Sequence, residues 1–414
     1  MECVGLCDVV LNLGVRNQEL ARFLASLIGV LLVSGVPLLT VIILILAERK
    51  IAARIQDRIG PNRVGPYGLL QTVADLLKLL GKEDITPTAA DRILYNAAPI
   101  ISFGSVVLLW AVIPFMYWNT PEGAANAVVG VNLEIGALFF VAIASLGTLA
   151  IMTAGWASNN KYALLGAFRV VALLVSYEIP LVFALVVPVM FAGSMSLVDI
   201  VEAQSHMWFV FMAPLAAILF FISSQAETGR APFDLIEAES ELIAGFNIEY
   251  SGMKFGMFFA AEFLHVFTNG ILMAVLFFGG YLGFFYKAIP PLGFLWLGLK
   301  GSLIYFVFLW LRNTVPRLRI DQVMNFNWFF LVPVSIINIM VTSLILKVMQ
   351  EMGYAPTVFA ESSLIGILPL TIVMLLKDAI IIGFILGRLG QEGRKARIEA
   401  THAEESLAAA AAGD

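Results

Sequence analysis

Long apolar segments separated by short polar connections run along almost the whole chain. A membrane-spanning helix needs roughly 20 mostly apolar residues, and nine segments meet this requirement. They lie at about 24–46, 94–116, 135–156, 170–192, 207–226, 257–285, 294–311, 327–346 and 364–387. Two amphipathic stretches, 49–58 and Tyr67 to about Leu80, are typical of helices that lie at a membrane surface. The pattern therefore predicts an all-α polytopic membrane protein with nine transmembrane helices plus amphipathic interfacial helices.

The composition supports this fold class. The 414 residues are 60% hydrophobic and 13% charged, whereas a soluble domain has about 25% charged residues. We expect residues 1–389 to form a single membrane domain and the Ala-rich, acidic residues 390–414 to form a disordered tail. Most Lys and Arg residues fall in loops on one side of the predicted spans, which places the N-terminus outside and the C-terminus in the cytoplasm.

The sequence offers few residues for metal or nucleotide chemistry. Its two cysteines, Cys3 and Cys7, both precede the first span, and an iron–sulfur cluster usually needs about four cysteine ligands. No second group of Cys or His suits zinc, and no glycine-rich phosphate-binding motif follows a strand-like run. We therefore expect no metal, no redox centre and no nucleotide in this chain.

The densest group of charges is PFDLIEAESELIAG, Pro232–Gly245, between two apolar segments. With Glu227 and Glu249 it places six carboxylates between positions 227 and 249, against one cation, Arg230. Like charges in helical register repel one another, and crowded carboxylates can share protons. The stretch predicts a proton-handling surface, although charge alone is equally consistent with a solvated acidic face.

Acidic residues also interrupt the apolar segments themselves. Glu178 lies about 13 Å into the fourth segment, where an ionised carboxylate costs about 2.5 kcal/mol or more unless it is paired, hydrated or protonated. Pro180 removes a backbone donor, so water or a polar side chain can approach there. Glu262 and His265 lie one turn apart in the sixth segment and could relay a proton, although a packed histidine is the alternative.

Other charged residues lie in later segments. Lys300 lies in the seventh segment, and a lysine near a helix end can snorkel to the interface. Lys377 and Asp378 are adjacent in the ninth segment, so on a helix they do not face each other. We expect this pair to need partners elsewhere, for example in neighbouring chains.

Several motifs resemble one family. GLLQTVADLLK, Gly68–Lys78, and the Pro232–Gly245 stretch are similar to two signature motifs of the quinone-channel membrane subunits (the H subunits) of respiratory complex I, NADH:quinone oxidoreductase. Further similarities are AERK at 47–50, GPNRVGP at 60–66, GWASNNKYALLGAFR at 155–169, SYEIP at 176–180, EYSGMKFGMFFAAEF at 249–263 and PRLRIDQVM at 316–324. The resemblance covers about residues 20–350, and the ninth segment and the tail lie beyond it. Ile236 is bulkier than the family's small residue, and the segment after Asn327 lacks a lysine often found there.

The resemblance implies a function as a non-redox component of a proton-translocating enzyme. Quinone would be the substrate, and FMN and iron–sulfur clusters would reside in partner subunits of the membrane and peripheral arms. The implied quinone-binding residues are Arg54, Arg230, Phe233 and Asp234. The implied proton path consists of Glu178, Glu227, Glu237, Glu239, Glu241 and Glu262.

Two alternatives remain open. A homologous component of a ferredoxin-linked quinone reductase or of an energy-converting hydrogenase would differ in its redox partner. A stand-alone secondary transporter is the other alternative, but the sequence has no internal repeat and concentrates its charged loops on one face.

Overall fold

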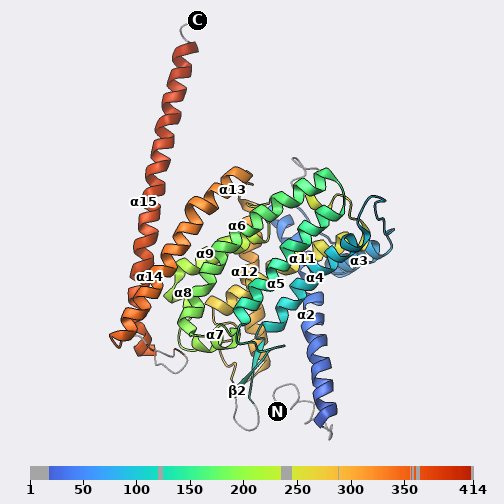
Figure 1. Ribbon diagram of the computed structural model, residues 1–414, viewed down its shortest axis with the longest axis horizontal. Coiled ribbons are helices and arrows are strands. Elements are labelled where there is room, and N and C mark those ends of the chain that lie inside the picture. Colours follow the sequence, from blue (N-terminus) through green and yellow to red (C-terminus); the bar gives the residue numbers. More distant parts are fainter. Residues whose placement is uncertain are drawn as a thin grey trace.

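A computed structural model describes residues 18–119, 125–234, 245–287, 289–354, 356, 359 and 364–411. Figure 1 shows a bundle of long helices with one small β-hairpin at one end. Within the described residues, eight helices are long and apolar enough to cross a membrane. The predicted all-α, polytopic membrane fold is confirmed.

The long helices agree with the apolar segments. They are α2 (Gln18–Ile55), α4 (Arg92–Leu109), α5 (Gly136–Ala157), α6 (Lys161–Ala192), α11 (Gly252–Phe277), α12 (Pro291–Thr314), α13 (Ile320–Phe326) continuing through the π-helix η4 (Asn327–Leu331) into α14 (Val332–Glu351), and α15 (Leu364–Ala411). Shorter elements are η1 (Pro66–Gly68), α3 (Gln71–Leu80), η2 (Trp110–Val112), α7 (Leu197–Ala203), α8 (Phe209–Met212), α9 (Pro214–Glu227) and η3 (Gly245–Asn247).

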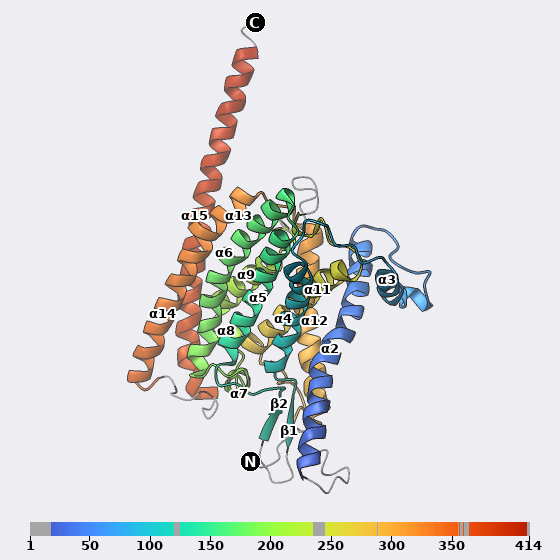
Figure 2. The same ribbon diagram turned by 45° about the vertical axis from the view of Figure 1, so that its right-hand side comes forward.

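The antiparallel hairpin is an addition to the predicted elements. β1 (Met116–Asn119) pairs with β2 (Ala125–Val128), with Met116 opposite Val128. The helix α2 begins near the hairpin, and α15 ends beyond the opposite face of the bundle (Figure 2). The two outermost described helices therefore end on opposite faces.

Close helix packing builds the interior. α4 packs on α5, α5 on α6, and α11 on both α4 and α12. Gly166 of α6 lies against the backbone of Gly245, where an added Cβ would come within 2.7 Å of a backbone carbon. Small residues allow such close backbone approach inside membranes. Trp110 is buried beside this packing and donates from Nε1 to Thr268 Oγ1 at 2.8 Å, which joins η2 to α11.

The predicted surface helix at 49–58 is wrong, whereas the second amphipathic helix is present as α3. α2 continues without a break to Ile55. Arg49 pairs with Asp75 of α3 at 2.5 Å, and Lys50 donates to the carbonyl of Tyr67 at 2.6 Å. The basic side chains at the end of α2 therefore hold the following loop and α3 against it.

The fifth predicted span, 207–226, is divided. α8 ends at Met212, Ala213 has a non-helical backbone (φ −137°, ψ 63°), and Pro214 begins α9. Proline has no N–H and cannot continue a helical hydrogen-bond ladder. The 14 residues of α9 extend about 21 Å, which is less than the roughly 30 Å hydrocarbon core.

The remaining differences concern the ninth segment and the tail. Lys377 and Asp378 do pair with each other, at 2.7 Å, and their further partners lie within this chain. The two flexible side chains bend toward one another although their Cα positions diverge. Helix α15 also extends to Ala411, so the region from 390 to 411 is helical where we expected disorder (Figure 1).

Lys300 closes the end of α11. Its Nζ donates to the carbonyls of Phe278, Gly280 and Leu282 at 2.6–2.9 Å and lies 4.7 Å from the ring of Trp208. The last carbonyls of a helix have no intrahelical partner, so the ammonium group satisfies them. Lys300 therefore acts as a helix cap, in addition to any contact with the interface.

Replacing Lys300 with methionine should lower the stability of the fold. Methionine keeps the apolar stem but leaves three carbonyl oxygens without their donor, at a cost of about 2–4 kcal/mol. Thermal unfolding in detergent should show a clearly lower midpoint. Lys347→Met is the matched control, because Lys347 forms an exposed pair with Glu351 that contributes little. Equal midpoints for the two variants would exclude the capping role.

Candidate functional site

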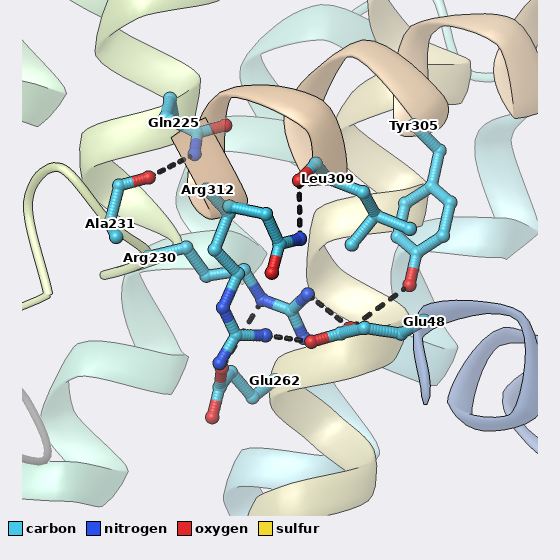
Figure 3. A network of polar contacts seen from close by, with 9 residues as sticks. Glu48, Gln225, Arg230, Ala231, Glu262, Tyr305, Leu309 and Arg312 are labelled. Carbon is cyan, nitrogen blue, oxygen red and sulfur yellow. Dashed lines mark hydrogen bonds and ion pairs between the residues drawn. The ribbon is translucent and has the colours of Figure 1, made fainter. Parts of the chain in front are cut away.

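A buried ion pair between Glu48 and Arg230 forms the centre of the site (Figure 3). Glu48 lies near the end of α2, and Arg230 follows α9, so the pair joins residues 182 positions apart. The Arg230 Nη1 atom lies 2.5 Å from Glu48 Oε2, and the arginine side chain is 1% exposed. Arg312 of α12 also pairs with Glu48, and the hydroxyl of Tyr305 donates to it at 3.3 Å.

Arg230 contacts a second carboxylate. Its Nε lies 3.3 Å from Glu262 Oε1 of α11, and its guanidinium lies 4.4 Å from the ring centroid of Phe263. A guanidinium over an aromatic ring gains a cation–π attraction, which is stronger when water is excluded. Arg230 is therefore shared between two carboxylates from different helices, and a change in the charge of one alters its hold on the other.

A tight turn after α9 directs Arg230 inward. Gly229 has φ 63°, a left-handed conformation that favours glycine. Gln225 donates from its side-chain amide to the carbonyl of Ala231 at 2.9 Å, and the N–H of Phe233 donates to the carbonyl of Arg230 at the same distance. These bonds fix the backbone on both sides of Arg230, so its side chain enters the bundle in one orientation.

The last residue of α9, Glu227, forms a second polar group. Its Oε2 accepts from the amide of Asn269 at 3.0 Å, and its Oε1 lies 3.8 Å from His265 Nε2. All three residues are largely buried, and Asn269 is 1% exposed. A buried carboxylate whose partners are an amide and a titratable imidazole is suited to gaining and losing a proton.

A cavity of about 80 Å³ connects the two groups. Glu227, Glu262 and His265 line it together with Asn247 and residues of α4, α5 and α6. A water molecule needs roughly 15 Å³ of such space and a few polar partners, so the cavity has room for several. Asn247 Oδ1 and His265 Nε2 have no hydrogen-bond partner among the described residues, and buried polar atoms are normally satisfied. Water in this cavity would connect Glu262 with Glu227.

Glu178 approaches the same group from α6. Its charge lies close enough to that of Glu227 for the two to interact. Two residues later, Pro180 cannot donate to the carbonyl of Ser176, and Asn327 Nδ2 donates to that carbonyl instead, at 2.6 Å. The expectation that a polar side chain approaches at Pro180 is confirmed. Asn327 begins the π-helix η4, so the irregular turn faces the irregular region of α6.

Comparisons with known proteins match the region that holds this site. A family model described as NADH dehydrogenase matches residues 28–343. The H subunit of the NADH-quinone oxidoreductase of Geobacillus thermodenitrificans is 48% identical over 302 residues, which cover 73% of this chain and 88% of that protein. The chain belongs to the H-subunit family of NADH-quinone oxidoreductase. A numbered relative, the first H subunit of Geobacter metallireducens, at 48% over 303 residues, and the H subunit of Brevibacillus brevis, at 45% over 305, cover 73% and 74% of the chain and 91% and 88% of their own length.

Membership in the H-subunit family extends over most of the fold. The matched residues include all members of the two polar groups, from Glu48 to Arg312, whereas α15 begins after the match ends. With its eight long apolar helices in the described part of the chain, the protein is a multi-pass membrane member of this family.

The structure brings four of the predicted site residues of this family member together and separates others. Arg230 and Glu262 pair directly, and Glu227 and Glu178 adjoin them through the cavity and across α6. Phe233 is 5% exposed and packs 5.3 Å from the ring of Tyr177. The predicted Glu237, Glu239 and Glu241 lie outside the described residues.

Arg54 and Asp234 lie apart from the central pair. Arg54 lines a separate groove of about 480 Å³ between α2 and α12, together with Lys50, Phe306 and Trp310. Asp234 is half-buried at the end of the described segment that follows Arg230. The groove gives Arg54 a position on the outer side of the bundle rather than in the Glu48–Arg230 group.

Sequence reasoning missed several members of the site. Glu48 belongs to the AERK motif but received no role of its own, and Tyr305, Arg312 and Asn269 were not singled out. A usable signal existed for Glu48, because it is an acid in an otherwise apolar helix followed directly by two cations. Asn269 has no comparable signal, since an asparagine in an apolar helix has many possible partners.

Proposed function

We propose that this chain is the membrane component of an NADH-quinone oxidoreductase that forms the quinone access tunnel and chamber and couples quinone reduction to proton translocation. The observation that carries the proposal is the buried series Glu48–Arg230–Glu262, continued through the cavity to Glu227. The names of the relatives support the enzyme class. NADH is the proposed donor, rather than ferredoxin, for the same reason.

The chain's own residues would handle protons and charge. Reduction of a quinone consumes protons together with electrons, and the electrons would come from FMN and iron–sulfur clusters in partner subunits. A proton from Glu227 would cross the cavity to Glu262. Protonation of Glu262 removes the charge that holds Arg230 Nε, so Arg230 is then attracted by Glu48 alone. Protonation at one end of the series would thereby alter the ion pair at the other end.

The remaining predicted residues have proposed positions along the quinone path. Arg54 would contact quinone at the membrane-facing mouth, in the groove with Phe306 and Trp310, because that groove is apolar and faces outward. Phe233 and Asp234 would lie nearer the chamber, beside Arg230. Glu237, Glu239 and Glu241 are proposed as the acidic loop that passes protons between the chamber and the buried acids.

The membrane orientation is also a proposal. The excess of Lys and Arg in the loops beside α3 and in α15 favours the cytoplasmic side for that face. The N-terminus would then lie outside and the C-terminus in the cytoplasm of a cell inner membrane. Other membrane and peripheral-arm subunits would contact the cytoplasmic face.

Replacing Glu178 with glutamine tests the proposed proton path. Glutamine has nearly the same shape but carries no exchangeable acid proton, and Glu178 interacts with the charge of Glu227. We expect proton translocation per NADH oxidised to fall severalfold in vesicles that contain the intact complex. Glu134→Gln is the control, because Glu134 is an exposed acid outside the cluster. Wild-type proton translocation in Glu178→Gln would argue against a relay role for this residue.

A further inference from the structure

A second polar cluster lies inside the bundle, beyond the region that matches the family. Lys377 and Asp378 of α15 are 6% and 1% exposed, and Lys377 Nζ lies 2.7 Å from Asp378 Oδ1. Burying two charges in a membrane is costly unless both are paired and hydrogen-bonded. The family match ends at residue 343, so α15 brings these charges into the bundle from outside the shared region.

Asp378 satisfies the backbone at the break between α8 and α9. Its Oδ2 accepts from the N–H of Leu215 at 3.1 Å. Leu215 is the second residue of α9, after the non-helical Ala213 and after Pro214, which has no N–H. Inside a membrane a broken helix has no water to satisfy its free N–H groups, so another helix has to supply the acceptor. A carboxylate at this position also interacts favourably with the positive end of the helix dipole.

Lys377 fixes the carboxylate from the other side. Its Nζ donates to Asn338 Oδ1 at 2.8 Å and to Thr342 Oγ1 at 2.7 Å, both on α14 and both 1% exposed or less. The ammonium group therefore has a carboxylate and two neutral acceptors around it. Through these contacts α15 is tied to α14 on one side and to the start of α9 on the other.

We propose that Asp378 is a positioning residue: the ninth span braces the break before α9 and thereby holds Glu227 in its place against Asn269. Glu227 is the last residue of α9, about 20 Å from the break. A helix transmits a displacement of its first turn to its last, so loosening at Leu215 moves Glu227 relative to the cavity. The role of Glu227 in this inference rests on the proposed function, whereas the brace itself does not.

Two matched double variants isolate the hydrogen bond from the buried charges. Lys377→Met with Asp378→Asn removes both charges but keeps an oxygen that can accept from Leu215. Lys377→Met with Asp378→Leu removes both charges and the acceptor. Thr371→Val serves as a control on the same helix, because Thr371 is buried and bonds to Met207 and to its own helix rather than to α9.

Hydrogen exchange in the intact complex measures the brace directly. We expect amides 215–219 to exchange about tenfold faster in the Leu variant than in the Asn variant, the change expected when a hydrogen bond to the first turn is lost. Thr371→Val should exchange at the wild-type rate there. Equal exchange in the two double variants would overturn the proposal.

A functional readout tests whether the brace positions Glu227. The pH profile of NADH:quinone reductase activity, per assembled complex, should shift in the Leu variant and remain at the wild-type position in the Asn variant. Faster exchange with an unshifted profile would reduce the contact to local stabilisation and overturn the positioning role. If Glu227→Gln itself leaves proton translocation unchanged, the proposed function fails, and the exchange experiment still decides the brace.

Discussion

Replacing Arg230 with alanine is expected to abolish quinone reduction. The substitution leaves Glu48 and Glu262 buried and removes the cation that they share. Breaking a buried pair by removing one partner costs about 3–5 kcal/mol, and each 1.36 kcal/mol corresponds to a factor of ten. We therefore expect NADH:quinone reductase activity to fall at least about a hundredfold in membranes. Electron transfer from NADH to an artificial acceptor at the peripheral arm should remain near the wild-type rate.

Further variants separate a local effect of Arg230→Ala from failed assembly. Arg58→Ala is the control, because Arg58 is exposed and bonds to the nearby Gln56 side chain. Arg230→Met combined with Glu48→Gln should assemble better than Arg230→Ala, since fewer buried charges are left unpaired, but should remain inactive. Equal loss of quinone reduction and of artificial-acceptor reduction would show that the complex fails to assemble, and normal quinone reduction would remove Arg230 from the mechanism.

The membrane fold was largely predictable because hydropathy is local information. Each long helix coincides with an apolar segment, since a span has to satisfy its own backbone and therefore needs a continuous apolar run. The fifth segment shows the limit of this reasoning. Pro214 was visible in the sequence, but whether it kinks a span or divides it depends on an acceptor for Leu215, and Asp378 supplies that acceptor 163 positions later.

The acidic members of the site were predictable for a different reason. Glu178, Glu227 and Glu262 stand out because an acid in or beside an apolar segment is costly and needs a cause. What each acid binds did not follow from its position. Arg230 pairs with Glu48 and Glu262 because the turn at Gly229 directs its side chain inward, and no local pattern specifies which helices will lie there.

The pair Lys377–Asp378 shows how a local rule misled the prediction. Adjacent residues on a helix project in different directions, which led us to expect separate partners. Long side chains can nevertheless bend toward each other when the surroundings are apolar and offer no water. Here α14 surrounds the ammonium group with Asn338 and Thr342, and the break at Leu215 attracts the carboxylate, so both side chains converge on one region.

Replacing Glu227 with glutamine should uncouple the proton path while it preserves the fold. Glutamine keeps an oxygen that can accept from Asn269 Nδ2, so the packing between α9 and α11 should remain. It has no acid proton to pass across the cavity to Glu262, so the path is interrupted between these two positions. Proton translocation in vesicles that contain the complex is expected to fall at least about tenfold, the lower range for loss of a proton-transfer group.

Two matched variants make the Glu227→Gln result decisive. Glu351→Gln changes an exposed acid at the end of α14 and should translocate protons at the wild-type rate. Asn269→Leu removes the amide but keeps the acid, so it should retain more translocation than Glu227→Gln if the proton, rather than the hydrogen bond, is what matters. Should Glu227→Gln translocate protons normally while Asn269→Leu fails, Glu227 would serve as a packing partner of α11, and the proton would have to reach Glu262 from the direction of Glu178.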